Sequence, residues 1–311
     1  MRGRLRIIVF VGMMLRVFPL WSQADLQLSQ HMFNRLNYNP AVTGASRYVN
    51  ISGYMRQQWT GWEGAPSSQM LTVHNYFEKV NSGFGFIFIH DAIGLENSVN
   101  AKITYAYHVK LSSNSYLSFG LSGGVLYRFF DRGDIFTDDM GESQLPLDIK
   151  DKAMADFDVG VEFNTYRFTA GVSVTHVNHT SKQQSDVAMV TGRHFYAFAK
   201  YTLPVAYHWE LEPSFFTQQN RKFVHSELNL LARYDDRFWF GASFRVNRDF
   251  VPESFVPMLG ANITEYLRIG YSYDFNMGVL KSYSEGTHEI VLGIRLRKGV
   301  SRSSKSPRFF E

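Results

Sequence analysis

Residues 99–111, Val-Asn-Ala-Lys-Ile-Thr-Tyr-Ala-Tyr-His-Val-Lys-Leu, alternate between two kinds of side chain. Odd-numbered positions such as Ile103 and Tyr105 are apolar or aromatic, and even-numbered positions such as Asn100 and Lys102 are mostly polar. Because successive side chains of a β-strand point to opposite faces, this pattern predicts a strand with one apolar and one polar face.

The same period of two recurs along the chain and predicts about fourteen strands. Their spans are 48–60, 67–77, 82–91, 97–112, 115–131, 155–164, 166–176, 192–203, 206–218, 222–234, 237–248, 255–264, 266–276 and 286–297. Tight turns, such as Pro204-Val205, alternate with longer polar connections, among them 61–68, 92–96, 132–154 and 176–191. This alternation is typical of an even-stranded outer-membrane β-barrel, with antiparallel strands, periplasmic turns on one rim and surface loops on the other.

A soluble β-sandwich or propeller is the competing fold, because soluble strands also alternate. The predicted strands are longer than the average of about five or six residues in globular proteins. Charged side chains also fall on the inferred inner face, where a polar lumen accommodates them better than a soluble core does. Tyr and Trp near strand ends, including Trp209 and Trp239, are expected to form aromatic girdles at the membrane interfaces. Both signs of charge face the lumen and predict a salt-bridged, filled interior: Lys102, Arg128, Glu162, Arg245, Arg268, Asp274, Glu289 and Arg295.

The first 24 residues have the form of a secretory signal peptide. They combine a basic start, an apolar stretch at 7–17 and the small-x-small sequence Ser22-Gln23-Ala24, which predicts cleavage after Ala24. The alternative is a membrane anchor, but the apolar stretch is short of the roughly 20 residues that span a bilayer, and Arg16 interrupts it.

Charge and cysteine content exclude several classes of protein. The net charge of +4 includes four arginines in residues 1–24, so the rest of the chain holds 28 basic and 28 acidic side chains. No basic patch interleaved with aromatic residues remains, which excludes nucleic acid as a partner. The chain has no cysteine, so disulfides and thiolate chemistry are absent.

The predicted organisation has four parts. A signal peptide, 1–24, precedes a short periplasmic leader or plug, 25–47, which is not a strand. Asn39-Pro40 ends any helix there, because proline forces extended backbone on the residue before it. The transmembrane barrel covers 48–297, and a basic disordered tail covers 298–311.

No constellation of residues predicts catalysis, a cofactor or a metal site. His90-Asp91 could belong to a hydrolytic triad, but no Gly-x-Ser-x-Gly motif accompanies it. His176 and His179 are expected in a solvated surface loop, without further ligands. The acidic residues between Asp131 and Glu142 lack the order of a calcium loop.

Residues 27–127 resemble the PorP/SprF family of type IX secretion system membrane proteins. The departure is at Val42-Thr43, where the family has an aromatic and a small residue. The resembling segments are Ser29-Gln30-His31-Met32-Phe33-Asn34, Asn39-Pro40-Ala41 with Gly44, Arg56-Gln57-Gln58-Trp59 with Gly61, Gly64-Ala65-Pro66 with Gln69, Gly83-Phe84-Gly85, Asp91-Ala92-Ile93-Gly94 and Tyr105-Ala106-Tyr107.

The resemblance implies a non-enzymatic component of the secretion and gliding system in the bacterial outer membrane. Its implied partners are a large secreted adhesin, bound through a C-terminal signal domain, type IX secretion or gliding subunits at the periplasmic rim, and outer-membrane lipid. The alternative function is a channel for small solutes. The leader and the first long loop are the expected partner-binding elements, with the residues Phe33, Tyr38, Asn39, Pro40, Trp59, Trp62, Glu63 and Pro66.

Overall fold

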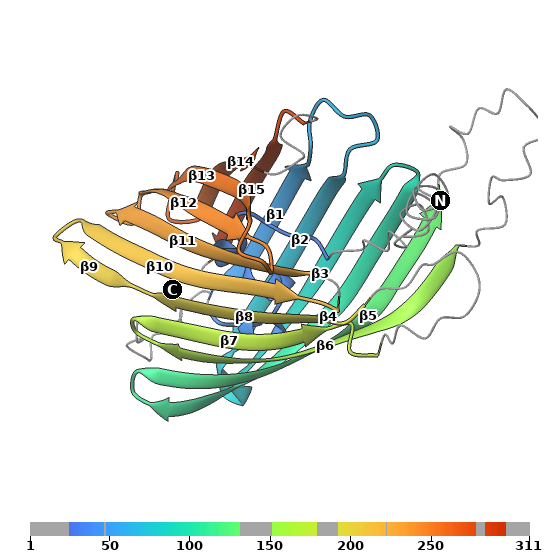
Figure 1. Cartoon of the computed structure of the whole chain (residues 1–311). Coiled ribbons are helices and arrows are strands. Elements are labelled where there is room, and N and C mark those ends of the chain that lie inside the picture. The colour runs from blue at the N-terminus through green and yellow to red at the C-terminus, as the bar shows by residue number, and fades with distance from the viewer. Residues whose placement is uncertain are drawn as a thin grey trace, which may run out of the picture.

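The computed structural model describes residues 25–46, 48–130, 151–178, 192–221, 223–277 and 284–296. All 15 strands of the described residues belong to one curved, antiparallel sheet that encloses a lumen (Figure 1). The strands are β1 (Val49–Gln57), β2 (Ser67–Phe77), β3 (Ser82–Ile93), β4 (Glu96–Ser112), β5 (Ser115–Phe130), β6 (Lys152–Thr165), β7 (Phe168–Thr175), β8 (His194–Tyr201), β9 (Leu203–Ala206), β10 (Trp209–Gln219), β11 (Val224–Tyr234), β12 (Phe238–Val246), β13 (Pro252–Asn262), β14 (Leu267–Asn276) and β15 (Thr287–Leu296).

The sheet closes on itself. β15 pairs with β1 over the whole length of β1, from Val49 opposite Leu296 to Gln57 opposite His288. β8 and β9 follow one another along the same edge of β10, so together they fill one position in the wall. The 15 strands therefore make 14 wall positions, which confirms the predicted barrel of about fourteen antiparallel strands.

Two connections differ from the prediction. The expected long loop at 92–96 is a two-residue turn, because β3 continues to Ile93 and β4 begins at Glu96. Gly94 takes a φ of +57° there, which glycine adopts at little cost. The turn expected at Pro204-Val205 is part of β9, and proline is tolerated in this strand because its only pairing is with β10.

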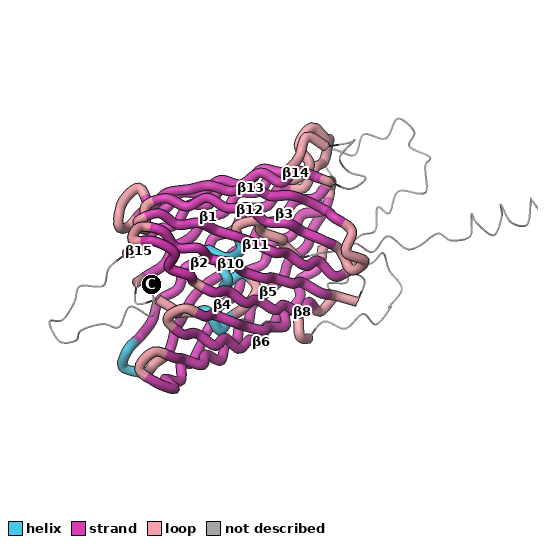
Figure 2. The backbone as a smooth tube through the Cα atoms, turned by 60° about the vertical axis from the view of Figure 1, so that its left-hand side comes forward, coloured by secondary structure: helices cyan, strands magenta, loops and turns pink. Residues whose placement is uncertain are grey.

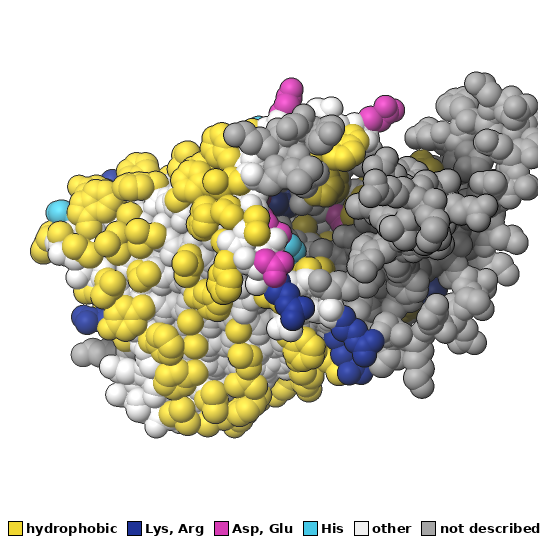
Figure 3. All heavy atoms as spheres, in the orientation of Figure 1, with side chains coloured by type: hydrophobic (Ala, Val, Ile, Leu, Met, Phe, Trp, Pro, Cys, Tyr) yellow, Lys and Arg dark blue, Asp and Glu magenta, His cyan; other side chains and the backbone are white. Residues whose placement is uncertain are grey.

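The two faces of the wall have opposite chemistry. Ile103 on the outer face is 68% exposed, whereas its neighbour Thr104 on the inner face is 0% exposed. Hydrophobic side chains spread over the outer wall, and most charged side chains in view lie toward its ends (Figure 3). An apolar surface of this extent is stable against lipid rather than water. Among the described residues, no helix has the length and apolar character needed to cross a membrane.

Residues 25–46, which we call the leader, lie inside the barrel. Three single-turn 3-10 helices, η1 (His31–Phe33), η2 (Arg35–Asn37) and η3 (Pro40–Val42), shape the leader within the tube of strands (Figure 2). A fourth, η4 (Glu78–Val80), belongs to the turn between β2 and β3. The predicted signal peptide, the acidic residues 131–142, His179 and the basic tail 298–311 lie outside the described residues.

Candidate functional site: a leader bound in the lumen

The leader crosses the lumen from one rim towards the other. Asp25 lies beside His176 and His194, at the connection between β7 and β8. At the other end of the leader, the Gly44 amide donates to His74 of β2 at 2.9 Å, shortly before β1 begins. Between these ends, η3 packs against β4, β5 and β6.

Five charged side chains of the wall hold the start of η1, and we call them the closure cluster: Arg56, Glu227, Arg245, Asp274 and Glu289. Arg56 lies 2.9 Å from Asp274 and 3.1 Å from Glu289. Arg245 lies 2.9 Å from Glu227 and 3.3 Å from Asp274. All five are buried in the lumen. Because they come from β1, β11, β12, β14 and β15, the cluster ties together the region of the wall where the barrel closes.

The leader completes this closure cluster with its backbone. The amides of Ser29 and Gln30 each donate to the Glu289 carboxylate at 2.7 Å. Ser29 Oγ donates to Asp274 at 2.6 Å and accepts from Arg56 at 2.7 Å. Hydrogen bonds to ionised groups are roughly twice as strong as neutral ones. The leader is therefore bound at this point by charge-assisted contacts on three strands.

The middle of the leader sits between an ion pair and an aromatic cluster. Arg35 makes two hydrogen bonds to Glu162 of β6, at 3.1 and 3.0 Å. Burial disfavours the charge of Arg35, but the Glu162 carboxylate outweighs it and raises the pKa of the guanidinium further above its usual value. Tyr38 packs against Phe216 with ring centroids 4.9 Å apart, and His31 stacks on the same ring at 4.2 Å.

The Asn39-Pro40-Ala41 motif begins η3. Proline fits the first position of a helical turn, and the Asn39 side chain accepts a hydrogen bond from the Ala41 amide at 3.0 Å. The Asn39 carboxamide also donates to the Val161 carbonyl of β6 at 3.2 Å. The motif thus shapes the leader and fastens it to the wall.

Glycines in the wall leave the space that η3 occupies. A Cβ added at Gly120 of β5 would lie 2.0 Å from the Ala41 amide nitrogen, and one at Gly83 of β3 would lie 1.9 Å from the Thr43 carbonyl oxygen. Neither position takes a left-handed backbone. These glycines are therefore required by close approach of two backbones rather than by a turn.

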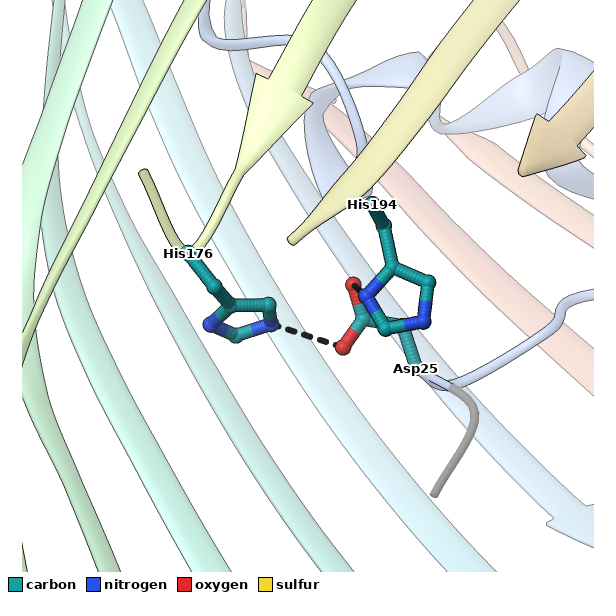
Figure 4. Close-up of side chains that lie close together, drawn as sticks. All are labelled: Asp25, His176 and His194. Atoms are coloured by element: carbon teal, nitrogen blue, oxygen red, sulfur yellow. Dashed lines mark hydrogen bonds and ion pairs between the residues drawn. The ribbon is translucent and has the colours of Figure 1, made fainter. Parts of the chain in front are cut away.

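Asp25 is held in a buried set of polar groups at the first end of the leader (Figure 4). Its carboxylate bonds to His176 Nε2 at 2.7 Å and accepts from Tyr196 Oη at 2.7 Å and Thr175 Oγ1 at 2.9 Å. Burial opposes ionisation of Asp25, but His176 and His194 outweigh it and hold the pKa of the carboxyl well below its usual range. Burial likewise opposes the charge on His176, but Asp25 and Asp156 raise its pKa to about 9.

The eight residues predicted to bind a partner fall into two separate groups. Tyr38, Asn39 and Pro40 are buried in the lumen, and Phe33 is half-buried against Trp239 and Arg268. The other four lie in the β1–β2 connection at the rim: Trp59, Trp62, Glu63 and Pro66.

Within the β1–β2 connection, Trp62 and Glu63 are exposed, whereas Pro66 is buried. The connection is tied to its neighbours: Thr60 N donates to Gly286 O at 2.9 Å, and Gly94 N donates to Gly64 O at 3.0 Å. Trp62 and Glu63 of the rim group are therefore accessible on an ordered connection, whereas the lumen group is largely covered.

Six of the eight predicted lumen-facing charges are in ion pairs, whereas Arg268 lies over the rings of Phe33 and Trp239 and donates to Asn262 at 3.0 Å. Lys102 contacts Asp156 and Asp158, and Glu162 contacts Arg35, so the predicted salt-bridged interior is confirmed for these paired side chains. Trp239 was expected in an interfacial girdle, but it is only 4% exposed and packs on Phe33 inside the barrel, which overturns that expectation. The reason is its position on the inner face of β12, with Arg245.

The expectation for His176 was also wrong. It was predicted in a solvated loop, yet it is 4% exposed and bonded to Asp25 and Asp156. Its φ of +54° breaks the alternation of β7 at this residue, so the strand pattern gave no sign of burial. His90 bonds to Gln69 at 2.7 Å, and Asp91 bonds to Ser68. Neighbours on a strand face opposite ways, so His90 and Asp91 do not form a catalytic pair.

A closed antiparallel wall, apolar outside and polar inside, with a bound leader, defines an outer-membrane β-barrel. Similar solved structures include the outer membrane protein Omp33 of Acinetobacter baumannii, at 10% identity and a TM-score of 0.47, covering 82% of this chain and 100% of that one. A deltaS2S3 mutant of the monoaromatic hydrocarbon channel TodX has 7% identity and a TM-score of 0.46, covering 86% and 93%. The KdgM porin has 9% identity and a TM-score of 0.38, covering 79% and 98%. No curated protein sequence matches this chain.

The family model of the type IX secretion system membrane protein PorP/SprF matches residues 21–294. The chain belongs to the PorP/SprF family. It is a membrane protein of the type IX secretion system, and its closed antiparallel barrel places it in the bacterial outer membrane.

Proposed function

We propose that this barrel acts without catalysis in type IX secretion and gliding. It supports the secretion or surface anchoring of a large partner adhesin, which it recognises through the partner's C-terminal signal domain. Its own leader keeps the lumen closed, so the barrel serves as a binding component and not as a route for solutes.

The observation that carries this proposal is the way the leader is held. Its backbone amides at Ser29 and Gln30 bind Glu289, and Arg35 forms a two-bond ion pair with Glu162. Removing one member of such buried ion pairs is costly, because it leaves an uncompensated charge. A solute channel through the lumen requires the leader to leave these sites, which favours binding over conduction.

The accessible partner surface lies at the rim that carries the longer connections. Short turns of outer-membrane barrels face the periplasm. The leader joins β1 at the short-turn rim, so Asp25 and the β1–β2 connection lie towards the cell surface. Trp62 and Glu63 are exposed there, and exposed tryptophan is a frequent anchor of protein interfaces. Secretion or gliding subunits meet the opposite, periplasmic rim.

The test is a pull-down of the tagged protein from detergent-extracted outer membranes, followed by mass spectrometry. We expect a large surface protein or secretion subunits to be recovered with the wild type. The double variant Trp62→Ala/Glu63→Ala should lose the surface protein but retain the periplasmic subunits. Recovery of the tagged protein without any partner, together with swelling of liposomes that contain it, would overturn the proposal in favour of a solute channel.

A further inference from the structure

We propose that Asp25, His176 and His194 form a binding site for one divalent transition-metal ion of the zinc class, which fastens the first residue of the leader to the barrel wall. This metal-site proposal does not depend on the proposed function in secretion. The three side chains come from the leader, the end of β7 and the start of β8, and Figure 4 shows them converging on one point.

The geometry suits a small metal ion. One ligand atom from each residue lies within 4.8 Å of the other two. His194 Nδ1 is 3.4 Å from Asp25 Oδ2, and His176 Nε2 is 2.7 Å from Asp25 Oδ1. Ligands about 2.0–2.1 Å from a tetrahedral zinc ion stand about 3.3 Å apart. The two distances involve different oxygens of the same carboxylate, so an ion that binds both histidines takes Asp25 as a bidentate ligand. The first pair already has this spacing, and the second pair needs to open by roughly half an ångström.

His194 supplies an independent sign of a missing ligand. The side chain is 0% exposed, and its Nδ1 points at Asp25 Oδ2 from 3.4 Å, a charge contact without the geometry of a hydrogen bond. Its other nitrogen, Nε2, lies 3.3 Å from the Asn220 carboxamide, which holds the ring in this orientation. Metal binding through Nδ1 places the proton on Nε2, so the carboxamide must then turn its oxygen to the ring.

The surroundings of His176 match those of a metal-binding histidine. Such residues usually donate their second ring N–H to a carboxylate, which fixes the ring. His176 Nδ1 lies 2.7 Å from Asp156 Oδ1, and its Nε2 is directed at Asp25. Hydrogen bonds from Thr175 and Tyr196 to Asp25 Oδ2 leave Oδ1 directed to His176. A metal ion at this point displaces the proton from His176 Nε2.

A second group, Asp156, Asp158 and His176, also has close ligand atoms. Lys102 already occupies that position, with its ammonium 2.8 Å from both aspartates. A cation of the chain therefore neutralises this group. Among the described side chains, the charge that faces Asp25 comes from imidazole rings rather than from a lysine or arginine, and a metal ion can replace the proton of an imidazole. Asp25, His176 and His194 are therefore the set that selects a metal ion.

The experiment uses the full-length protein in detergent, carrying a tag without histidine and freed of metal with a chelator. We expect about one equivalent of Zn²⁺ by calorimetry, and Co²⁺ should give the strong visible absorption of a four-coordinate ion. Asp25→Asn and His194→Gln should each lose stoichiometric binding while keeping the shift on unheated gels that reports a folded barrel.

The matched control is His208→Gln. His208 also pairs with an aspartate, Asp235, but it is half exposed at the opposite rim and has no second histidine. This variant should bind zinc as the wild type does. No stoichiometric binding by the wild type, or equal binding by the wild type and Asp25→Asn, would overturn the metal site and leave a purely hydrogen-bonded anchor.

Discussion

Ser29 donates its backbone N–H to the carboxylate of Glu289, 260 positions further along the chain, at 2.7 Å. Glu289 belongs to β15, the strand that closes the barrel against β1. The leader is therefore bound to the strand that closes the wall. Closure of the barrel forms the binding site of the leader, and the bound leader in turn stabilises the closed barrel.

Glu289→Gln should destabilise the barrel. It removes the charge that receives two leader amides and one of the two carboxylates that pair with Arg56, so we expect a loss of up to about 3–5 kcal/mol, the cost of breaking a buried pair. Guanidinium unfolding in micelles measures the loss. Glu265→Gln, an exposed residue of the turn between β13 and β14, is the control and should change nothing. Equal stability of the two variants would mean that the closure cluster does not hold the leader.

Gly120→Val should expel η3 from the wall, because even a Cβ at Gly120 would stand 2.0 Å from the Ala41 amide. Trypsin should then cut after Arg35, which the wild type protects through its pairing with Glu162. Gly53→Val is the matched control, since a Cβ at Gly53 meets nothing within 4 Å. If Arg35 stays protected in Gly120→Val, the leader does not depend on this contact.

Thr43→Cys/Thr104→Cys should lock the leader by a disulfide. The two Oγ1 atoms stand 2.9 Å apart, and the chain has no cysteine that could compete. Because we propose that the leader stays in the lumen, the oxidised variant should recover as much partner as the reduced one. Partner recovery that appears only after reduction would show instead that the leader must move, and Thr43→Cys alone controls for the substitution.

Trp62→Ala should reduce recovery of the surface partner by about tenfold, which is typical of an exposed aromatic anchor at an interface. Trp62 is half exposed and its ring lies 6.1 Å from that of Trp59, so truncation leaves the barrel wall untouched. Tyr207→Ala is the control, because Tyr207 is 96% exposed at the opposite rim. An equal loss of partner with both variants would argue against a specific role for the β1–β2 connection.

The alternation of side chains was sufficient to predict the wall. Within each strand the alternation of apolar and polar residues shows which face is polar. Lys102 and Asp274 could therefore be assigned to the lumen without knowledge of their partners. Strand ends were less certain at the β3–β4 turn, where Ile93 pairs with Glu96, because nothing in the local sequence marks the end of the paired strands there.

The contacts of the leader could not be predicted from local patterns. The Asn39-Pro40 sequence predicted that no helix continues through it, but the glycine opposite Pro40 lies about 80 positions later in β5, and only the closed barrel brings the two together. Asp25, His176 and His194 meet for the same reason. His176 is buried because its own backbone turns to a left-handed conformation at the end of β7, and the sequence does not indicate this conformation.

The conductance of the wild-type protein in a planar lipid bilayer tests the central claim most directly. A barrel closed by its leader should show no steady conductance, and a variant lacking residues 25–45 that still folds should conduct. Steady conductance of the wild type, equal to that of the leaderless variant, would contradict the closed barrel and assign the protein to solute channels.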